Sequence, residues 1–217
     1  MKFKKLVDLS IPITESTPIF PGDPKPCLKQ VTAIEQDGFN VSTLQLGSHT
    51  GTHVDAPFHF LEDGLKMEEV PLRQFIGKGV VFDVRGKEKG SAITLEDVRD
   101  RLDECEEGDL ALFCTGWSQY LGQELYFEHP YIDISVIEEL LKRGVKTVFI
   151  DALNIDPADG SSFAGHHAIL SVNGAIGENF MNFEQIDFKD PLIIAFPLKL
   201  IGSDGSPVRA VAVQLNE

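Results

Sequence analysis

The sequence contains few cysteines, and their spacing excludes two common roles. Only Cys27, Cys105 and Cys114 occur among 217 residues, and no two of them form a CxxC pair. A small, odd number of cysteines provides no disulfide framework, which is typical of a protein from a reducing compartment. We therefore expect a cytoplasmic protein.

Basic side chains and long apolar runs are also scarce. The 34 acidic side chains outnumber the 19 basic ones, so the formal charge is −15. A surface of this sign repels phosphate backbones and anionic lipids. No apolar run approaches the ~20 residues that a membrane span needs, and Asp8 and Pro12 interrupt the apolar stretch that follows the basic start. We expect neither nucleic acid nor a membrane as a partner.

The chain also lacks internal repeats, low-complexity linkers and a GxSxG nucleophile motif. Its 42% hydrophobic and 24% charged composition is ordinary for a globular protein. Because no composition shift marks a boundary, we predict one domain over residues 1–217. Serine or cysteine nucleophile catalysis has no support in the sequence, since the cysteines have no evident activating neighbour either.

Two helix-to-strand units are predicted in the middle of the chain. Thr94, with Asp97 three residues later, is typical of a capping box at a helix start, and a strand over 110–115 follows. A second helix begins near Ser135, ends at Gly144 and leads into a strand over 147–150. Further strands are predicted over 39–46 (half-exposed), 80–84 (buried), 192–196 and 208–215. This pattern indicates a mixed α/β fold with helices packed on a sheet.

Three of the six histidines lie in one short segment, together with an aspartate. The spacing of His49 and His53 fits a zinc-binding helix, but glycine, proline and β-branched residues within the segment disfavour a helix. An extended segment places His49, His53, Asp55 and His59 on one face. Pro57 would then end the strand and turn His59 toward the other three.

This combination of side chains favours a metal site. Neutral imidazole with carboxylate suits zinc, manganese or iron(II). The alternatives are surface or core histidines without a ligand, and a closed structural metal site. Structural zinc sites are usually rich in cysteine, and no cysteine lies near this segment.

A second group of candidate ligands lies far along the chain. His166 and His167 are followed by Glu178, and alone these residues are weak indications of a site. Asp151 and Asp156 follow an apolar strand, where layered sheets often present functional groups. They could equally cap loops.

Together these residues resemble those of the metal-dependent cyclase family, which contains bacterial kynurenine formamidase and isatin hydrolase. The resemblance covers nearly the whole chain. The family signature HxGTHxDxPxH is complete as His49, Gly51, Thr52, His53, Asp55, Pro57 and His59. Further matches are the segment 18–23, Gly116-Trp117, His129-Pro130-Tyr131, 144–145, 150–151, Asp156, His166-His167, Glu178-Asn179 and 206–210.

The resemblance implies a centre with two divalent ions, zinc or manganese, in each chain. One ion would be held by His49, His53 and Asp55. Asp55 would bridge to a second ion held by His166 and Glu178. The spacing between these last two residues, 178 − 166 = 12, is that of the family and favours His166 over its neighbour as the ligand.

The resemblance also implies a role for His59 as general acid/base, acting on an amide bond with an activated water as nucleophile. A histidine suits both proton transfers because its unperturbed pKa is close to neutral pH. His59 could instead be a further ligand or a positioning residue. His167 would lie outside the ligand set.

The implied fold is a single-domain swivelling β/β/α fold that assembles as a homodimer or homotetramer. The implied activity is that of an arylformamidase on N-formylkynurenine, in tryptophan catabolism. The resemblance implies a tryptophan at the position of Phe20, as in kynurenine formamidases of this family. Phe20 could still stack on an aromatic substrate. Trp117 is a second candidate pocket aromatic. The alternatives are an isatin hydrolase-like enzyme for cyclic amides or lactones, and a non-catalytic module that binds a metal or ligand.

Overall fold

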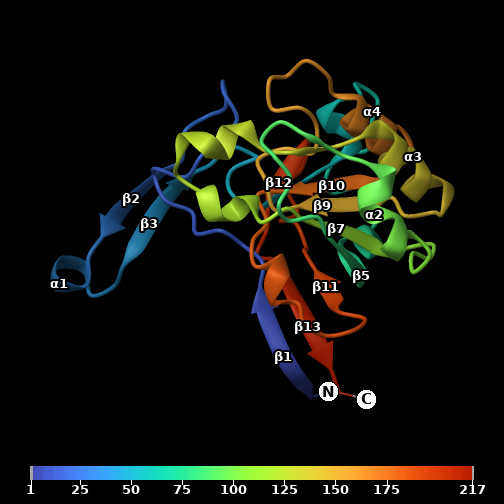
Figure 1. Ribbon diagram of the computed structural model, residues 1–217. Coiled ribbons are helices and arrows are strands. Elements are labelled where there is room, and N and C mark those ends of the chain that lie inside the picture. Colours follow the sequence, from blue (N-terminus) through green and yellow to red (C-terminus); the bar gives the residue numbers. More distant parts are fainter. Residues whose placement is uncertain (1, 217) are drawn as a thin grey trace.

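A nine-stranded mixed sheet forms the centre of the computed structural model, which describes residues 2–216 (Figure 1). Its strands follow the order β1-β13-β11-β5-β7-β9-β10-β4-β12. In that order they span Phe3–Asp8, Val211–Leu215, Leu192–Ile194, Ile76–Asp83, Leu110–Cys114, Thr147–Ile150, Ala175–Glu178, His53–Asp55 and Gly205–Pro207.

The middle of the sheet is parallel, and three of its four strands are buried along their whole length. β5, β7, β9 and β10 pair in parallel, whereas β4 and β12 on one side and β11, β13 and β1 on the other pair antiparallel. Every residue of β7 is buried, as expected of a parallel strand covered on both faces. Ala111 and Phe113 contribute to the core on one face, and Leu110 and Leu112 to the core on the other. The predicted mixed α/β arrangement is thus observed.

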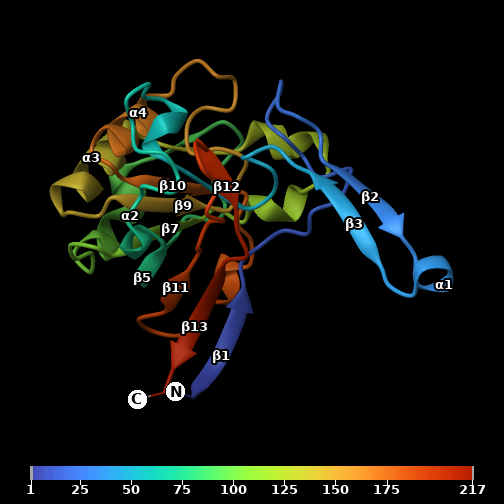
Figure 2. The same cartoon turned by 180° about the vertical axis from the view of Figure 1, so that it is seen from behind.

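Three helices pack on one face of the sheet, and two of them were predicted. They are α2 (Leu95–Leu102), α3 (Ile134–Lys142) and α4 (Ala164–Ser171), and Figures 1 and 2 show them gathered on the same side. At the start of α2, the Asp97 carboxylate accepts hydrogen bonds from the backbone N–H and the hydroxyl of Thr94, at 2.7 and 2.8 Å. After α3 the chain turns at Gly144, whose φ of 81° is the left-handed conformation that glycine adopts easily.

A hairpin made of β2 (Cys27–Thr32) and β3 (Val41–Gln45) projects from the body of the molecule, with the short helix α1 (Ile34–Asp37) at its tip (Figures 1 and 2). All five residues of β3 are exposed. The prediction of a half-exposed strand over 39–46 was therefore right about the strand and wrong about burial, because the alternating pattern has no second layer to pack against.

The remaining regular elements are short. A second small sheet pairs β6 with β8, and five 3-10 helices lie in the connections. Their bounds are β6 Ala92–Ile93, β8 Tyr131–Ile132, η1 Pro57–His59, η2 Leu72–Phe75, η3 Trp117–Tyr120, η4 Glu124–Glu128 and η5 Phe183–Gln185. Between residues 2 and 216, no helix has the length and apolar character that crossing a membrane requires.

Candidate metal centre

The signature segment is extended only in its middle. His53 to Asp55 form β4, but His49 lies in the preceding turn and Pro57 opens the 3-10 turn η1, which ends at His59. The prediction that the strand ends at Pro57 is confirmed, whereas the extended backbone does not reach back to His49. Gly51, with φ of 70°, turns the chain where a Cβ atom would lie 2.9 Å from the Cγ1 of Ile13.

The sheet brings β4 and β10 together so that their carboxylates and imidazoles meet. His53 and Glu178 are opposite each other in the register of the two strands. The Nε2 atom of His53 is 3.4 Å from Oδ1 of Asp55 and 3.6 Å from Oε2 of Glu178. These three side chains are almost completely buried.

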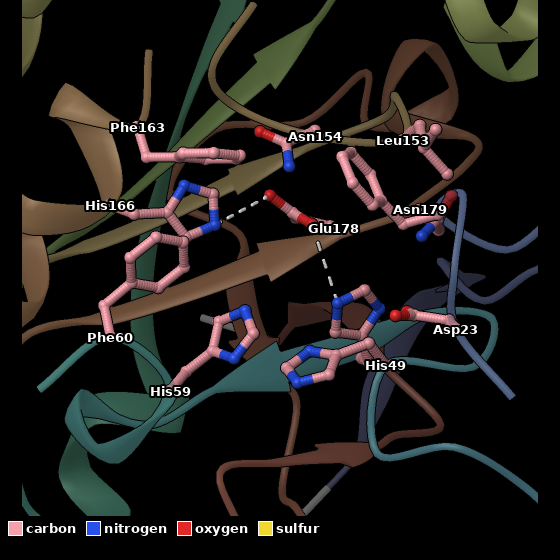
Figure 3. Close-up of a pocket in the computed structure, with 12 residues that line it drawn as sticks. Asp23, His49, His59, Phe60, Leu153, Asn154, Phe163, His166, Glu178 and Asn179 are labelled. Carbon is pink, nitrogen blue, oxygen red and sulfur yellow. Dashed lines mark ion pairs between the residues drawn. The ribbon is translucent and has the colours of Figure 1, made fainter. Parts of the chain in front are cut away.

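Helix α4 contributes His166 to the same cluster. Its Nε2 atom lies 3.4 Å from Oε1 of Glu178 (Figure 3). The same atom lies 3.7 Å from Oδ2 of Asp55. The Oδ1 atom of Asp55, in contrast, lies 2.7 Å from Nδ1 of His49. The two oxygens of Asp55 thus face different histidines, which is the arrangement expected of a carboxylate that bridges two ions.

The chemistry of these donors fits divalent ions. The Nε2 atom of His53 and the Oδ2 atom of Asp55 are buried and have no hydrogen-bond partner among the described residues. Buried polar atoms are normally paired, and separations of 3.4 to 3.7 Å are long for hydrogen bonds. These separations suit donor atoms that bind one common ion, because such an ion lies roughly 2.0 to 2.2 Å from each nitrogen or oxygen.

The electrostatics of the cluster favour a cation. Burial, and then the charge of Asp55, raise the pKa of Glu178, so two buried carboxylates repel each other here. Burial opposes ionisation of Asp55 as well, but His49 and His53 hold its pKa below its usual range. Burial lowers the pKa of His53 to about 4, which keeps its imidazole neutral and able to bind a metal at neutral pH.

Neighbouring oxygens fix the orientation of two of these rings. Asp156 lies 2.7 Å from Nδ1 of His166, which directs the Nε2 atom at the cluster. The carbonyl oxygen of Gly51 is 2.8 Å from Nδ1 of His53. In metal sites, such outer partners set the tautomer and the basicity of the ligand.

The other residues singled out in the sequence lie at different distances from the centre. His167 is exposed beside Phe60, outside the cluster. Asp151 is buried and accepts hydrogen bonds from the backbone of Thr115 and Gly116, so it holds a loop. Trp117 belongs to the core on the helix side, and its Nε1 donates to the carbonyl of Leu125. Asp156, in contrast, contacts a candidate ligand directly.

A cavity of about 160 Å³ opens beside the cluster. Phe20 lies in its wall, as expected, and Figure 3 shows Phe60 and Phe163 on the side of His166. An aromatic wall next to a polar cluster suits a flat apolar substrate with one reactive polar group. The lining residues are Phe20, Asp23, His49, His53, His59, Phe60, Leu153, Asn154, Phe163, His166, Glu178 and Asn179.

His59 lies at the edge of the cavity, partly exposed. Its ring centroid is 4.0 Å from that of His49, and its Nδ1 is 3.4 Å from Oδ2 of Asp204. A nitrogen of His59 also lies within 4.8 Å of donor atoms of His49 and Asp55, so the geometry allows a ligand role too. Sequence reasoning missed Asp204, which lies two residues before the matching segment 206–210.

Comparison with known proteins places this site in a family. The Cyclase family model matches residues 7–157. A curated kynurenine formamidase of Bacillus cereus is 31% identical over 212 residues, which cover 97% of this chain and 98% of the relative. The chain belongs to the cyclase family.

Solved structures agree with the cyclase fold. An isatin hydrolase bound to the product analogue thioisatinate superposes with a TM-score of 0.91 over 98% of this chain and 93% of that one, at 22% identity. A structure described as a potential metal-dependent hydrolase with cyclase activity is 28% identical, with a TM-score of 0.79 over 98% and 99% of the two chains. The predicted fold class and family resemblance are confirmed.

Proposed function

We propose that this cyclase-family protein is a metal-dependent hydrolase of carbon–nitrogen bonds in amides, with N-formylkynurenine as its first candidate substrate. One observation carries the proposal. The buried Asp55 directs one oxygen toward His49 and His53 and the other toward His166. The names of the Bacillus cereus relative and of the solved hydrolases support the same chemistry.

We assign the first ion to His49, His53 and Asp55, and the second to Asp55, His166 and Glu178. Zinc or manganese suits these ligands, at two ions per chain. Bound divalent ions lower the pKa of water and polarise a carbonyl group. The protein contributes the imidazoles of three histidines, the bridging carboxylate of Asp55 and a cavity beside them.

His59 moves the proton in this proposal. Its Nδ1 faces Asp204, which leaves Nε2 to accept a proton from the attacking water. After water adds to the carbonyl carbon, the C–N bond breaks and the same proton passes from Nε2 to the leaving nitrogen. Hydrolysis of a formamide then releases formate and an amine.

The aromatic walls of the cavity orient the substrate. Phe20 and Phe60 line the same cavity as the cluster, so a substrate ring held between such faces would present an adjacent amide to the metals. Phe20 offers less stacking area than a tryptophan. The enzyme could therefore favour a cyclic amide or lactone, and the close superposition on isatin hydrolase supports this second candidate.

We further propose that the protein works in the cytoplasm as a homodimer or homotetramer, on a small molecule and without nucleic acid or membrane partners. The three free cysteines support the cytoplasmic location. The charge of −15 supports the absence of nucleic acid and membrane partners. Exposed apolar side chains on the β2–β3 hairpin support self-association.

A turnover assay tests the proposal. Protein stripped of metal and reloaded with zinc or manganese should release formate from N-formylkynurenine or open the ring of isatin, and stripped protein should do neither. His59→Asn should bind the same metal but lose most turnover. His167→Asn, which changes an exposed neighbour of the ligand His166, is the matched control. Loaded protein that binds amides without consuming them would be a binding module instead.

A further inference from the structure

Asp204 lies in a loop that the sheet holds against the signature segment. Its carbonyl oxygen accepts a hydrogen bond from the backbone N–H of Ala56 at 2.9 Å. The next residue, Gly205, pairs with Asp55 in the register of β12 and β4. A Cβ atom on Gly205 would lie 2.7 Å from Cε1 of His49, so the glycine lets the loop approach the ring.

The carboxylate of Asp204 faces two histidines at once. Its Oδ2 atom lies 3.0 Å from Nε2 of His49 and 3.4 Å from Nδ1 of His59. The two rings are stacked at a tilt of 33°, so both nitrogens can be directed at one oxygen. A carboxylate oxygen has two lone pairs and can accept both hydrogen bonds.

These contacts indicate which nitrogen of each ring is turned away from Asp204. When Nε2 of His49 donates to Asp204, the other nitrogen, Nδ1, is the one that faces Asp55 at 2.7 Å. When Nδ1 of His59 donates, Nε2 carries the lone pair. A histidine N–H held by a carboxylate is a common way to set tautomer and basicity in metal sites.

We propose that Asp204 is a positioning residue that sets the tautomers of His49 and His59 together, so that one ring can bind metal through Nδ1 and the other can exchange a proton through Nε2. The part that concerns His59 rests on the proposed function. A single side chain would thus couple metal binding to proton transfer, although it touches neither the substrate nor an ion.

The partners of Asp204 support this role. The side chain of Asp204 is 36% exposed, and its Oδ2 atom contacts a ring nitrogen of each histidine. The loop itself is held by other groups. The Glu68 carboxylate accepts a hydrogen bond from the N–H of Gly202 at 2.9 Å, and Met67 donates from its N–H to the carbonyl of Ser203.

The test compares two acidic residues of the same loop region. Asp204→Ala removes the proposed acceptor, and Glu68→Gln weakens the anchoring of the loop without facing either histidine. In zinc-loaded wild-type protein labelled with ¹⁵N-histidine, nuclear magnetic resonance should show Nδ1 of His59 protonated and Nε2 free. Asp204→Ala should give a mixture of tautomers for His59. Glu68→Gln should keep the wild-type spectrum.

Binding and kinetics give the second measurement. Asp204→Ala should weaken zinc affinity, measured by competition with a chelator, by about 10- to 100-fold. At saturating metal its kcat should fall by a similar factor while KM stays near the wild-type value. Asp204→Glu should restore part of both.

The outcomes separate this inference from the proposed function. Wild-type protein that binds zinc with the stated tautomers but hydrolyses no amide would contradict the function and the proton-transfer role alone. An Asp204→Ala protein with wild-type tautomers, zinc affinity and kcat would overturn the inference while the function stands. Equal losses in Asp204→Ala and Glu68→Gln would also overturn it, because they would show that only loop anchoring matters.

Discussion

Two buried histidines of the centre each have one ring nitrogen committed to a nearby oxygen, and this leaves the other nitrogen for the cluster. For His53 the oxygen is the carbonyl of Gly51, and for His166 it is the carboxylate of Asp156. Preorganised rings of this kind lose little conformational freedom when an ion binds. The site is therefore specified by backbone turns and outer carboxylates as well as by its ligands.

The wall residue Phe20 should determine how well an aromatic substrate binds. Phe20→Ala removes one aromatic face of the cavity. The KM for N-formylkynurenine or isatin, whichever the enzyme hydrolyses better, should rise by about 5- to 10-fold. This corresponds to about 1 kcal/mol of lost stacking. Steady-state kinetics on N-formylkynurenine and isatin measure this effect. Phe127→Ala, at a partly exposed ring outside the cavity lining, is the control. An unchanged KM would remove Phe20 from the substrate site.

The three cysteines should differ in reactivity. Cys27 is exposed, whereas Cys105 and Cys114 are buried. Burial raises the pKa of Cys105 to about 11 and that of Cys114 well above its usual range, so neither forms thiolate at pH 8. Iodoacetamide should label one thiol in the folded protein and three after unfolding, counted by mass spectrometry. Rapid labelling of all three in folded protein would contradict the packing described here.

Among single residues, sequence reasoning found the donors but not the groups that orient them. His49, His53 and Asp55 are recognisable because they stand in one short signature. Asp204 is far from His49 in sequence, and only the pairing of β12 with β4 brings them together. A single sequence contains no local signal for such a contact.

At the scale of elements, helix α4 depends on a carboxylate that lies outside it. Oδ1 of Asp156 accepts from the N–H of Gly165 at 2.8 Å, and Oδ2 accepts from the N–H of His166 at 3.0 Å. These N–H groups belong to the first turn of α4, and the N–H groups of a first turn have no acceptor within the helix. The same carboxylate thus begins the helix and orients the ring of His166.

Asp156→Asn should weaken the second metal site. An asparagine side chain has one oxygen and one NH2 group in place of the two carboxylate oxygens. Its NH2 group would face the N–H of Gly165 or the nitrogens of His166, so His166 would lose its fixed orientation. We expect affinity for the second ion to fall by about 10- to 100-fold and stability to fall by roughly 1 kcal/mol.

Calorimetric zinc titration and urea denaturation measure these two changes. Asp159→Asn is the matched control, because Asp159 accepts a hydrogen bond from the N–H of Ser161 in an exposed loop. Two tight zinc sites in Asp156→Asn would contradict the role given to this residue.

Elements with local signals were predicted well. The capping box at Thr94 and the glycine at position 144 mark α2 and α3, and the apolar strand over 147–150 has the predicted bounds. Helix α4 was not predicted, because its cap comes from Asp156 and its sequence contains a glycine and two histidines. The strands over 192–196 and 208–215 are shorter than predicted, at Leu192–Ile194 and Val211–Leu215.

At the scale of the whole molecule, the β2–β3 hairpin projects from the body of the protein (Figure 2). It carries large apolar side chains that are exposed. Val31 and Leu44 are 58% and 61% exposed, and Ile34 at the tip is 62% exposed. Apolar side chains gathered on a projecting element are typical of an association surface. The charge of −15 on each chain opposes self-association.

We therefore expect a salt-dependent oligomer. Light scattering should give a mass at least twice that of the chain, and dissociation should increase at low ionic strength, where screening is weakest. The double variant Val31→Lys/Leu44→Lys should be monomeric. Ile201→Lys changes an apolar side chain that is 79% exposed in another loop and should remain associated. A monomeric wild-type protein would contradict the assembly proposal.

The metal-to-protein ratio tests the central claim most directly. Stripped protein reloaded with zinc or manganese should contain about two ions per chain by elemental mass spectrometry. Asp55→Ala should lose most of both ions because Asp55 faces both halves of the cluster, whereas Asp159→Ala should keep them. Circular dichroism on each sample establishes that it is folded. Folded wild-type protein with almost no bound metal after reloading would contradict the two-ion centre and the hydrolytic mechanism built on it.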